Sequence, residues 1–366
     1  MKINVSKNEL YNKLRTVGKI VQPSKTIPEL EYFKLECSDV LKVTGSDNSG
    51  SITAIIECEK ESGSFNFLID AKTILSALKE LSEQPIVIEV TGSKVTLLYH
   101  NGEFELIGHN SMAFPVVVVP IDSFDVMIER QTLIDGIKSV LQFTANEELR
   151  PVMNGVNFQS KDGKLTFVAT DATKLGVHEY DFESQNFSSI VPKKTAKIIY
   201  DMVSNMDTDT ITLTISDKNI ALNTGIYSLV YRLIDGRFPN FRAVIPTTNH
   251  IRLQINRGDL IAAISRMTVF SNRSTSLIML ELSNNTLRIT SNDTDFSLAA
   301  KETIPVDYNG ESLNIGFGGN TLVDVLNSIT TEECLLTFSN SQRAALVTPI
   351  GLSGVTLLIM PVLINN

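Results

Sequence analysis

The chain has 366 residues, of which 43% are hydrophobic and 20% charged, and its formal net charge at pH 7 is −9. This length and composition are typical of a globular protein of two or three domains, each with its own core. The acidic balance argues against nucleic acid as a partner, because binding phosphates needs a surplus of Lys and Arg.

Six segments with the apolar spacing of amphipathic helices are separated by short runs typical of strands. In chain order, the predicted helices cover residues 9–21, 71–81, 131–143, 192–203, 257–270 and 318–329. They fall into three successive pairs, with strands after each helix. The sequence therefore predicts an α+β protein made of strand-rich units that each hold two helices.

A short strand-like stretch of apolar residues followed by an Asp occurs three times along the chain. The three aspartates, about 120 residues apart, are Asp47, Asp171 and Asp293. A second landmark, a proline after an apolar residue, repeats at the same spacing at Pro115, Pro239 and Pro361. Because solenoid repeats are only about 20–50 residues long, this period indicates a tandem triplication of a whole domain. The repeated Asp itself is explained by a turn, since an Asp just after a strand accepts backbone N–H groups.

The joints between the repeats, residues 116–124 and 243–250, are short and contain Pro rather than Gly/Ser runs, so neighbouring domains should be held rigidly. We expect domains at 1–120, 121–246 and 247–366. Similar units stacked head to tail by one rotation form a ring if the rotation closes and a filament if it does not.

The predicted helices together carry more Lys and Arg than Asp and Glu, although the whole chain is acidic. If all the helices face one surface, that surface is basic and attracts a phosphate backbone. The alternative, that surface helices commonly carry Lys, stays open at this point.

Residues that would indicate a cofactor, a metal or secretion are not arranged in the patterns that those functions need. Cys37, Cys58 and Cys334 are an odd number without a CxxC motif, which predicts buried, reduced thiols. The four histidines lack ligand spacing and there is no P-loop, so no metal and no cofactor are expected. The chain has neither a signal peptide nor a stretch of roughly 18 apolar residues, and we therefore expect a cytoplasmic protein.

Two other functional classes deserve comparison. The stretches around Asp47 and Asp171 resemble the Asp-Thr-Gly pair of an aspartic-protease-like hydrolase, in which two carboxylates share a proton. Neither stretch has Gly two residues after the Asp, and three copies are one too many. A β-rich binding scaffold outside the cell is disfavoured by the missing secretion signal and the unpaired cysteines.

Several short motifs, in register from the first helix to the last strand, resemble the bacterial beta sliding clamp family, the processivity subunit of the replicative DNA polymerase. These motifs are LRPVMNGV (149–156), ATDATKL (169–175), DGRFPNF (235–241), FSNRS (270–274) and LLIMPV (357–362). The resemblance implies the DNA clamp fold: a head-to-tail homodimer whose six domains form a ring, with helices lining the pore and sheets outside.

The resemblance also implies a function without catalysis. The ring would encircle double-stranded DNA without sequence preference and tether the replicative polymerase catalytic subunit, the clamp loader, repair polymerases and other proteins with a clamp motif. The expected DNA-facing residues are Lys19, Lys25, Lys72, Lys79, Arg150, Lys193, Lys194, Lys197 and Arg266. The expected dimer interface joins Phe104 and Leu106 of one subunit to Val269 and Phe270 of the other.

Carried over position by position, a pocket for partner peptides would lie between the second and third domains. Its residues would be Met153, Thr170, Leu175, Pro239, Val244, Leu346, Leu358, Met360 and Pro361. They are mostly apolar, which suits the anchoring of hydrophobic side chains. Pro361 removes a ladder donor, so we expect the last strand to end before it.

The chain departs from the family pattern near this pocket. Residues 172–174 read Ala-Thr-Lys where the familiar form has Gly-His-Arg, Thr321 replaces an aromatic residue, and the tail 363–366 does not end with an Arg.

Overall fold

The structure is a computed structural model that describes residues 1–363, apart from the side chain of Ser62. The predicted tail departure at 364–366 lies outside the described residues. The chain folds into two compact units: unit 1 holds Met1–Arg130 and Asp201–Leu233, and unit 2 holds Gln131–Tyr200 and Ile234–Asn366. Strands from the region predicted as a middle domain take part in both units, because two sheets continue across the predicted domain boundaries.

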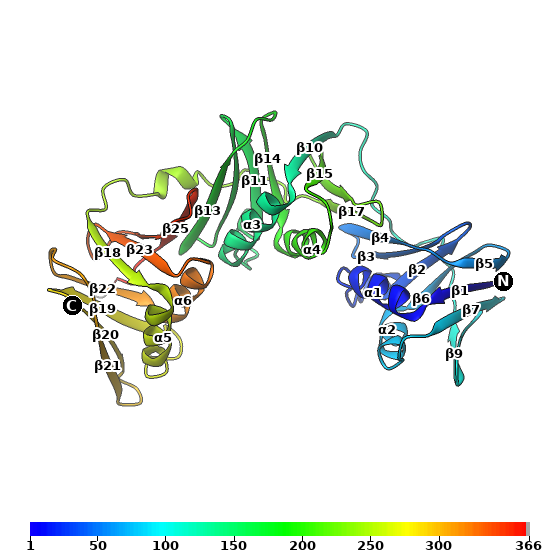
Figure 1. Ribbon diagram of the computed structural model, residues 1–366, viewed down its shortest axis with the longest axis horizontal. Helices are drawn as coiled ribbons and strands as arrows, with labels where there is room; N and C mark the ends of the chain where they lie inside the picture. Colours follow the sequence, from blue (N-terminus) through cyan, green and yellow to red (C-terminus); the bar gives the residue numbers. More distant parts are fainter. Residues whose placement is uncertain (364–366) are drawn as a thin grey trace. The chain divides into compact units, whose positions relative to one another are not determined.

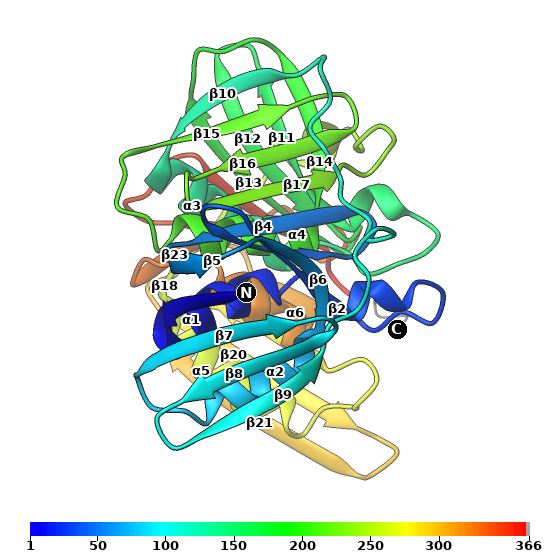
Figure 2. The same ribbon diagram turned by 90° about the vertical axis from the view of Figure 1, so that its right-hand side faces the viewer.

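Unit 1 contains two antiparallel sheets. The five-stranded sheet has the order β5 (Glu59–Ser62), β1 (Lys2–Ser6), β7 (Pro85–Thr91), β8 (Lys94–Tyr99) and β9 (Gly102–Ile107). The eight-stranded sheet has the order β10 (Phe124–Glu129), β15 (Thr210–Ile215), β16 (Asn219–Asn223), β17 (Tyr227–Arg232), β4 (Gly50–Ile56), β3 (Leu41–Ser46), β2 (Tyr32–Cys37) and β6 (Phe65–Asp70). Figure 2 shows β7, β8 and β9 side by side, with β9 at the sheet edge.

Unit 2 also contains two antiparallel sheets. Its eight-stranded sheet has the order β14 (Phe187–Pro192), β11 (Gly155–Lys161), β12 (Lys164–Thr170), β13 (Lys174–Asp181), β25 (Val355–Ile359), β24 (Ala345–Pro349), β23 (Glu333–Phe338) and β18 (Ile251–Asn256). Its four-stranded sheet has the order β21 (Leu298–Pro305), β20 (Thr286–Asp293), β19 (Leu277–Ser283) and β22 (Leu313–Gly318). The pairing of β13 with β25 joins residues from two sequence repeats in one sheet.

All six predicted helices are present among the described residues. They are α1 (Lys7–Val17), α2 (Ala71–Lys79), α3 (Arg130–Val140), α4 (Lys193–Val203), α5 (Arg257–Thr268) and α6 (Gly319–Asn327). Helix α1 begins two residues earlier than predicted because the Ser6 hydroxyl accepts the Glu9 N–H at 3.3 Å. Asp70 caps α2 and Asn256 caps α5 in the same way.

Helices of the first and third repeats bury their apolar faces against strands. Leu10, Leu14 and Val17 of α1 are fully buried and face β3 and β4. In unit 2, α5 and α6 pack against each other (Figure 1), and α5 also contacts β18, β19 and β20. Removing this apolar surface from water, at about 25 cal/mol per Å², is the main term that stabilises such a fold.

The repeated Asp forms a local turn in each copy. The Asp47 carboxylate accepts two backbone N–H groups at 3.0 and 3.1 Å, and the Asp171 carboxylate accepts two at 2.8 Å. Asp293 accepts the backbone N–H of Asp295 at 3.0 Å. These carboxylates hold turns, as the sequence predicted, and the hydrolase interpretation loses its basis.

The cysteine prediction is only partly right. Cys37 and Cys334 are buried, and burial raises the pKa of each thiol to about 11, but Cys58 is only half-buried because it lies in the open turn between β4 and β5. Within residues 1–363, no helix is long and apolar enough to cross a membrane.

Candidate functional site

A row of four predicted pocket residues runs across one face of the eight-stranded sheet of unit 2. Thr170 on β12 lies opposite Leu175 on β13, Leu175 lies opposite Leu358 on β25, and Leu358 lies opposite Leu346 on β24. Directly opposite residues of an antiparallel sheet point to the same face. The sheet register therefore brings together residues that are up to 188 positions apart in the sequence.

The segment 234–245 crosses this face and packs on it. Phe238 and Phe241 are buried there, and Ile234 and Ile245 pack at the margin. We call the buried group the linker cluster; its members are Val168, Leu175, Val177, Ile190, Phe238, Phe241, Ala344 and Leu358. Most of these residues were not predicted from the sequence, although the alternation of apolar residues along β12 and β13 could have identified Val168 and Val177.

Apolar side chains at the margin of the linker cluster remain open to solvent. Val244 is 58% exposed and Met360 43% exposed, while Pro239 and Pro361 are half-buried. Strand β25 ends at Ile359, as predicted from Pro361. The Met360 N–H then donates to the Thr173 carbonyl at 2.8 Å, which fixes Met360 beside the turn that follows Thr170.

Met153 differs from the other predicted pocket residues. It ends a short 3₁₀ turn, η3 (Pro151–Met153), is half-buried, and accepts the Ala145 N–H through its carbonyl at 2.8 Å. The residue of this turn that packs against the linker cluster is its neighbour Val152.

Polar groups of the turn at 170–174 are occupied by the turn itself. The Thr170 hydroxyl donates to the Lys174 carbonyl at 2.8 Å and accepts the Ala172 N–H at 3.1 Å. The Lys174 side chain is only 9% exposed, reaches Asp324 at 3.4 Å and lies 5.8 Å above the Phe143 ring. Lys174 is thus engaged with α6 and is not a free charge at the pocket.

Some of the nine predicted DNA-facing residues hold carboxylates. Lys19 holds Asp201 at 2.6 Å, Arg150 holds Glu147 at 2.9 Å, and Arg266 holds Glu302 through Nε at 2.9 Å. The hydrogen bond from Arg266 lowers the pKa of Glu302. Lys25, Lys72, Lys79, Lys193 and Lys197 are exposed, and Lys194 is half-buried.

The first turn of α4 concentrates basic side chains. Lys193 and Lys194 lie in this turn, which holds no acidic residue, and Lys197 follows one turn later. A helix N-terminus carries a partial positive charge, so cations there are unfavourable by a few tenths of a kcal/mol to about 1 kcal/mol each.

Predicted interface residues lie on exposed elements. Phe104 and Leu106 are half-buried on the edge strand β9, where Phe104 contacts the Tyr99 ring at a centroid distance of 4.8 Å. Val269 and Phe270, directly after α5, are 74% and 40% exposed. In unit 2, β21 is likewise an edge strand. Both edges offer unpaired backbone groups.

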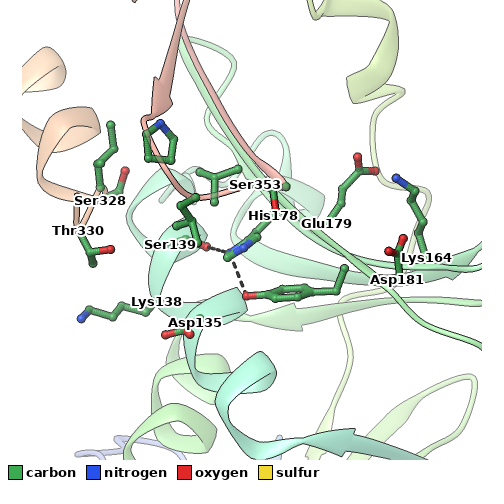
Figure 3. Close-up of a pocket in the computed structure, with 16 residues that line it drawn as sticks. Asp135, Lys138, Ser139, Lys164, His178, Glu179, Asp181, Ser328, Thr330 and Ser353 are labelled. Atoms are coloured by element: carbon green, nitrogen blue, oxygen red, sulfur yellow. Dashed lines mark hydrogen bonds between the residues drawn. The ribbon is translucent and has the colours of Figure 1, made fainter. Parts of the chain in front are cut away.

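A cavity of about 550 Å³, separate from the predicted peptide pocket, lies around His178 toward the end of β13 that is farther from Lys174 (Figure 3). His178 Nδ1 is 3.0 Å from the Ser139 hydroxyl and 3.1 Å from the Tyr180 hydroxyl. Burial lowers the pKa of His178, and the backbone carbonyl of Asp135 opposes this effect. These contacts satisfy a buried neutral imidazole.

Domain models of one protein family match almost the whole chain. Residues 1–118, 127–240 and 242–363 match the N-terminal, central and C-terminal domains of the DNA polymerase III beta subunit. The beta sliding clamp of Chlamydia muridarum is 28% identical over 354 residues, 95% of each chain. That of Haemophilus influenzae is 27% identical over 99% of each chain.

Solved structures have the same fold. The DNA polymerase III subunit beta of Pseudomonas aeruginosa, solved with bound griselimycin, is 26% identical and superposes with a TM-score of 0.93 over 100% of both chains. The beta subunit of Thermotoga maritima, at 23% identity, also reaches a TM-score of 0.93 over both full chains, which supports the fold alone. With three consecutive domain matches along its length, the chain belongs to the DNA polymerase III beta subunit family, the bacterial beta sliding clamps.

Proposed function

We propose that this chain is a sliding clamp that encircles duplex DNA and tethers the replicative polymerase, which makes synthesis processive. The observation that carries the proposal is the tandem match of all three beta-subunit domains along the chain. The family is a non-catalytic processivity factor, so the chain is not an enzyme. The hydrolase alternative is not favoured.

We infer that the ring is a homodimer of three-domain subunits with domains at 1–120, 121–246 and 247–366. Two three-domain chains would supply the six similar units of the closed ring that the family resemblance implies. The edge position of β9 and the exposed side chains of Val269 and Phe270 support an interface between the first domain of one subunit and the third of its partner.

Within this ring, the exposed lysines of the helices would face the DNA. The lysines at the start of α4 support this role, because their charge is unfavourable for the helix but favourable beside phosphates. Phosphate contacts carry no base information, so binding should be independent of sequence. Lys19, Arg150 and Arg266 would contribute less, since each already holds a carboxylate.

We further propose that the row on β12, β13, β25 and β24, together with Pro239, Val244, Met360 and Pro361, binds short peptides of partner proteins. The exposed apolar side chains of Val244 and Met360 support this, because exposed apolar surface beside a hydrophobic cluster can mark an interaction site. Met suits several partners because its thioether repacks easily. The polymerase catalytic subunit, the clamp loader and repair polymerases are the expected partners, in the cytoplasm where the bacterial chromosome lies.

The test is topological. The protein is loaded by a clamp loader onto nicked circular DNA, the free protein is removed by gel filtration, and the DNA is then cut once by a restriction enzyme. A clamp stays on the circle and leaves the linear DNA from its ends. Equal retention on both forms, or a strong preference for one DNA sequence, would show that the protein binds DNA in some other way.

A further inference from the structure

The face of the unit 2 sheet that carries the candidate peptide pocket also holds a second hollow. A cavity of about 930 Å³ lies between strands β11 and β14 and the segment 235–242. Pro239, which we assign to the peptide pocket, lines this cavity as well. We call it the linker cavity; a chain bound in the peptide pocket needs to extend only past Pro239 to enter it.

The linker cavity has an unpaired hydrogen-bond donor in its wall. Asn157 on β11 is 1% exposed, and its Oδ1 accepts the Ser188 hydroxyl at 3.0 Å. Its Nδ2 is buried and has no hydrogen-bond partner among the described residues. A buried donor left unpaired costs about 1–3 kcal/mol. A ligand oxygen that reaches Asn157 would remove this cost.

Charged side chains around Asn157 are mostly cationic. Lys161, Arg237 and Arg242 line the cavity, against Asp235 as the one carboxylate in its lining. Arg242 is held by Gln159 at 3.2 Å and Glu179 at 2.6 Å. Arg237 is exposed and holds no carboxylate among the residues that the structure describes. Lys161 lies 4.0 Å from the exposed Asp162 carboxylate, so Arg237 is the cation of the lining best placed to attract an anionic ligand.

Apolar walls restrict the kind of anion. Phe238 and Phe241 line the cavity from the segment above, and their rings lie 6.5 Å apart in an edge-to-face arrangement. The combination of amide donor, guanidinium and aromatic wall suits a carboxylate on a short aliphatic stem, as in Asp or Glu of a peptide.

We propose that the linker cavity binds an acidic side chain of a partner peptide whose apolar residues occupy the neighbouring peptide pocket. Asn157 Nδ2 donates to the carboxylate, and Arg237 and Lys161 supply its counter-charge. The inference rests on the proposed peptide-binding function and adds a charge preference to it: partners with an acidic residue beside their apolar anchors bind tighter.

The experiment uses three fluorescent peptides that share one clamp motif of Gln followed by aliphatic and aromatic residues. One has neutral flanks, one carries two Asp before the motif and one carries two Asp after it. Fluorescence anisotropy with the full chain should show one acidic peptide binding about fivefold tighter or more than the neutral peptide at low salt. The advantage should shrink at 0.5 M salt, where charges are screened within a few ångströms.

Variants locate the effect. Arg237→Glu and Lys161→Glu change exposed side chains and should each remove the advantage of the acidic peptide while the neutral peptide binds as before. Arg252→Glu, at an exposed position on β18 outside the cavity, is the matched control and should leave all three affinities unchanged. Asn157→Leu should act like Arg237→Glu; if it does not fold, the two exposed positions decide.

The outcomes separate the two levels of the proposal. If the neutral peptide binds and neither acidic peptide binds tighter, the charge preference is wrong and the peptide pocket stands. An acidic advantage that survives Arg237→Glu and Lys161→Glu also overturns the role of the linker cavity. If none of the three peptides binds, the peptide-binding function and this inference fall together.

Discussion

Ala172 lies in the turn between the pocket residues Thr170 and Leu175, with a φ of 75°. An L-residue in this region costs roughly 1–2 kcal/mol because its Cβ crowds the backbone, and Gly avoids that cost. In the first repeat the equivalent position after Asp47 is Asn48, at 68°, a residue type that tolerates this region better. The Ala at 172 is therefore a strained departure from the Gly of the family pattern.

We predict that Ala172→Gly stabilises the protein by about 0.5–1 kcal/mol, the relief of strain being partly offset by the greater freedom of the unfolded chain. Urea unfolding measures the change. The matched control is Ala262→Gly, at an exposed position in α5, which should destabilise by about 1 kcal/mol. Destabilisation by both substitutions would contradict the assigned backbone conformation.

His178 gives the stability a defined pH dependence. Burial lowers its pKa in the folded protein below the ordinary value of 6.5, so the unfolded chain binds a proton more readily. The stability that the neutral His178 contributes is fully present above about pH 6.5. It is lost as the pH falls through the folded pKa, by at most about 1.4 kcal/mol per pH unit. Urea unfolding between pH 7.5 and 5 should show a smaller decline for His178→Gln than for the wild type. Parallel declines would exclude His178 as the source.

At the scale of elements, one contact joins β13 to α6. Lys174 and Asp324 are 150 residues apart in sequence, and the Gln142 amide also donates to the Asp324 carbonyl at 2.6 Å. Because the Lys174 side chain is buried, loss of its partner leaves a charge without compensation.

Asp324→Asn should therefore destabilise the protein by roughly 1–3 kcal/mol, measured by denaturant unfolding. Adding Lys174→Met to this variant should restore part of the loss, because no buried charge remains. The exposed pair Arg288 and Glu281, 3.5 Å apart, provides the control: Glu281→Gln should change stability by less than about 0.5 kcal/mol. A similar loss in both variants would count against a special role of the β13–α6 contact.

Helix α4 offers a test of DNA association. Reversal of Lys193, Lys194 and Lys197 to Glu should reduce loading onto DNA and flatten the dependence of binding on salt, since fewer counterions are released. The helix itself should persist by circular dichroism, because acidic residues are favourable at a helix N-terminus. Lys218→Glu, in the turn between β15 and β16, should leave DNA retention intact. Unchanged loading of the triple variant would remove α4 from the DNA-facing surface.

At the scale of the whole molecule, the ring requires a homodimer of about twice the 40.3 kDa chain mass. Phe270→Arg should shift the mass measured by light scattering to that of a monomer, because a charge buried in an apolar interface is costly by several kcal/mol. Leu149 is 93% exposed in unit 2, so Leu149→Arg should remain dimeric. A wild-type monomer at micromolar concentration would contradict the ring.

Local information in the sequence determined the elements. Apolar spacing located all six helices, the Asp residues predicted three turns, and Pro361 predicted the end of the last strand. Helices, turns and strand ends of this kind depend mainly on residues a few positions apart. Repetition of these local signals at one period revealed the triplication.

Only the tertiary structure decided which distant side chains meet. The register of β13 with β25 places Leu175 opposite Leu358. Val152, and not Met153, packs against the linker cluster. The Lys174 side chain is buried against α6. Some of the predicted DNA-facing cations proved to be paired with carboxylates, and Asn157 was left with an unpaired donor beneath the segment 235–242. Pairings of this kind depend on strand register and on the competition of many side chains for the same space, neither of which a run of neighbouring residues contains.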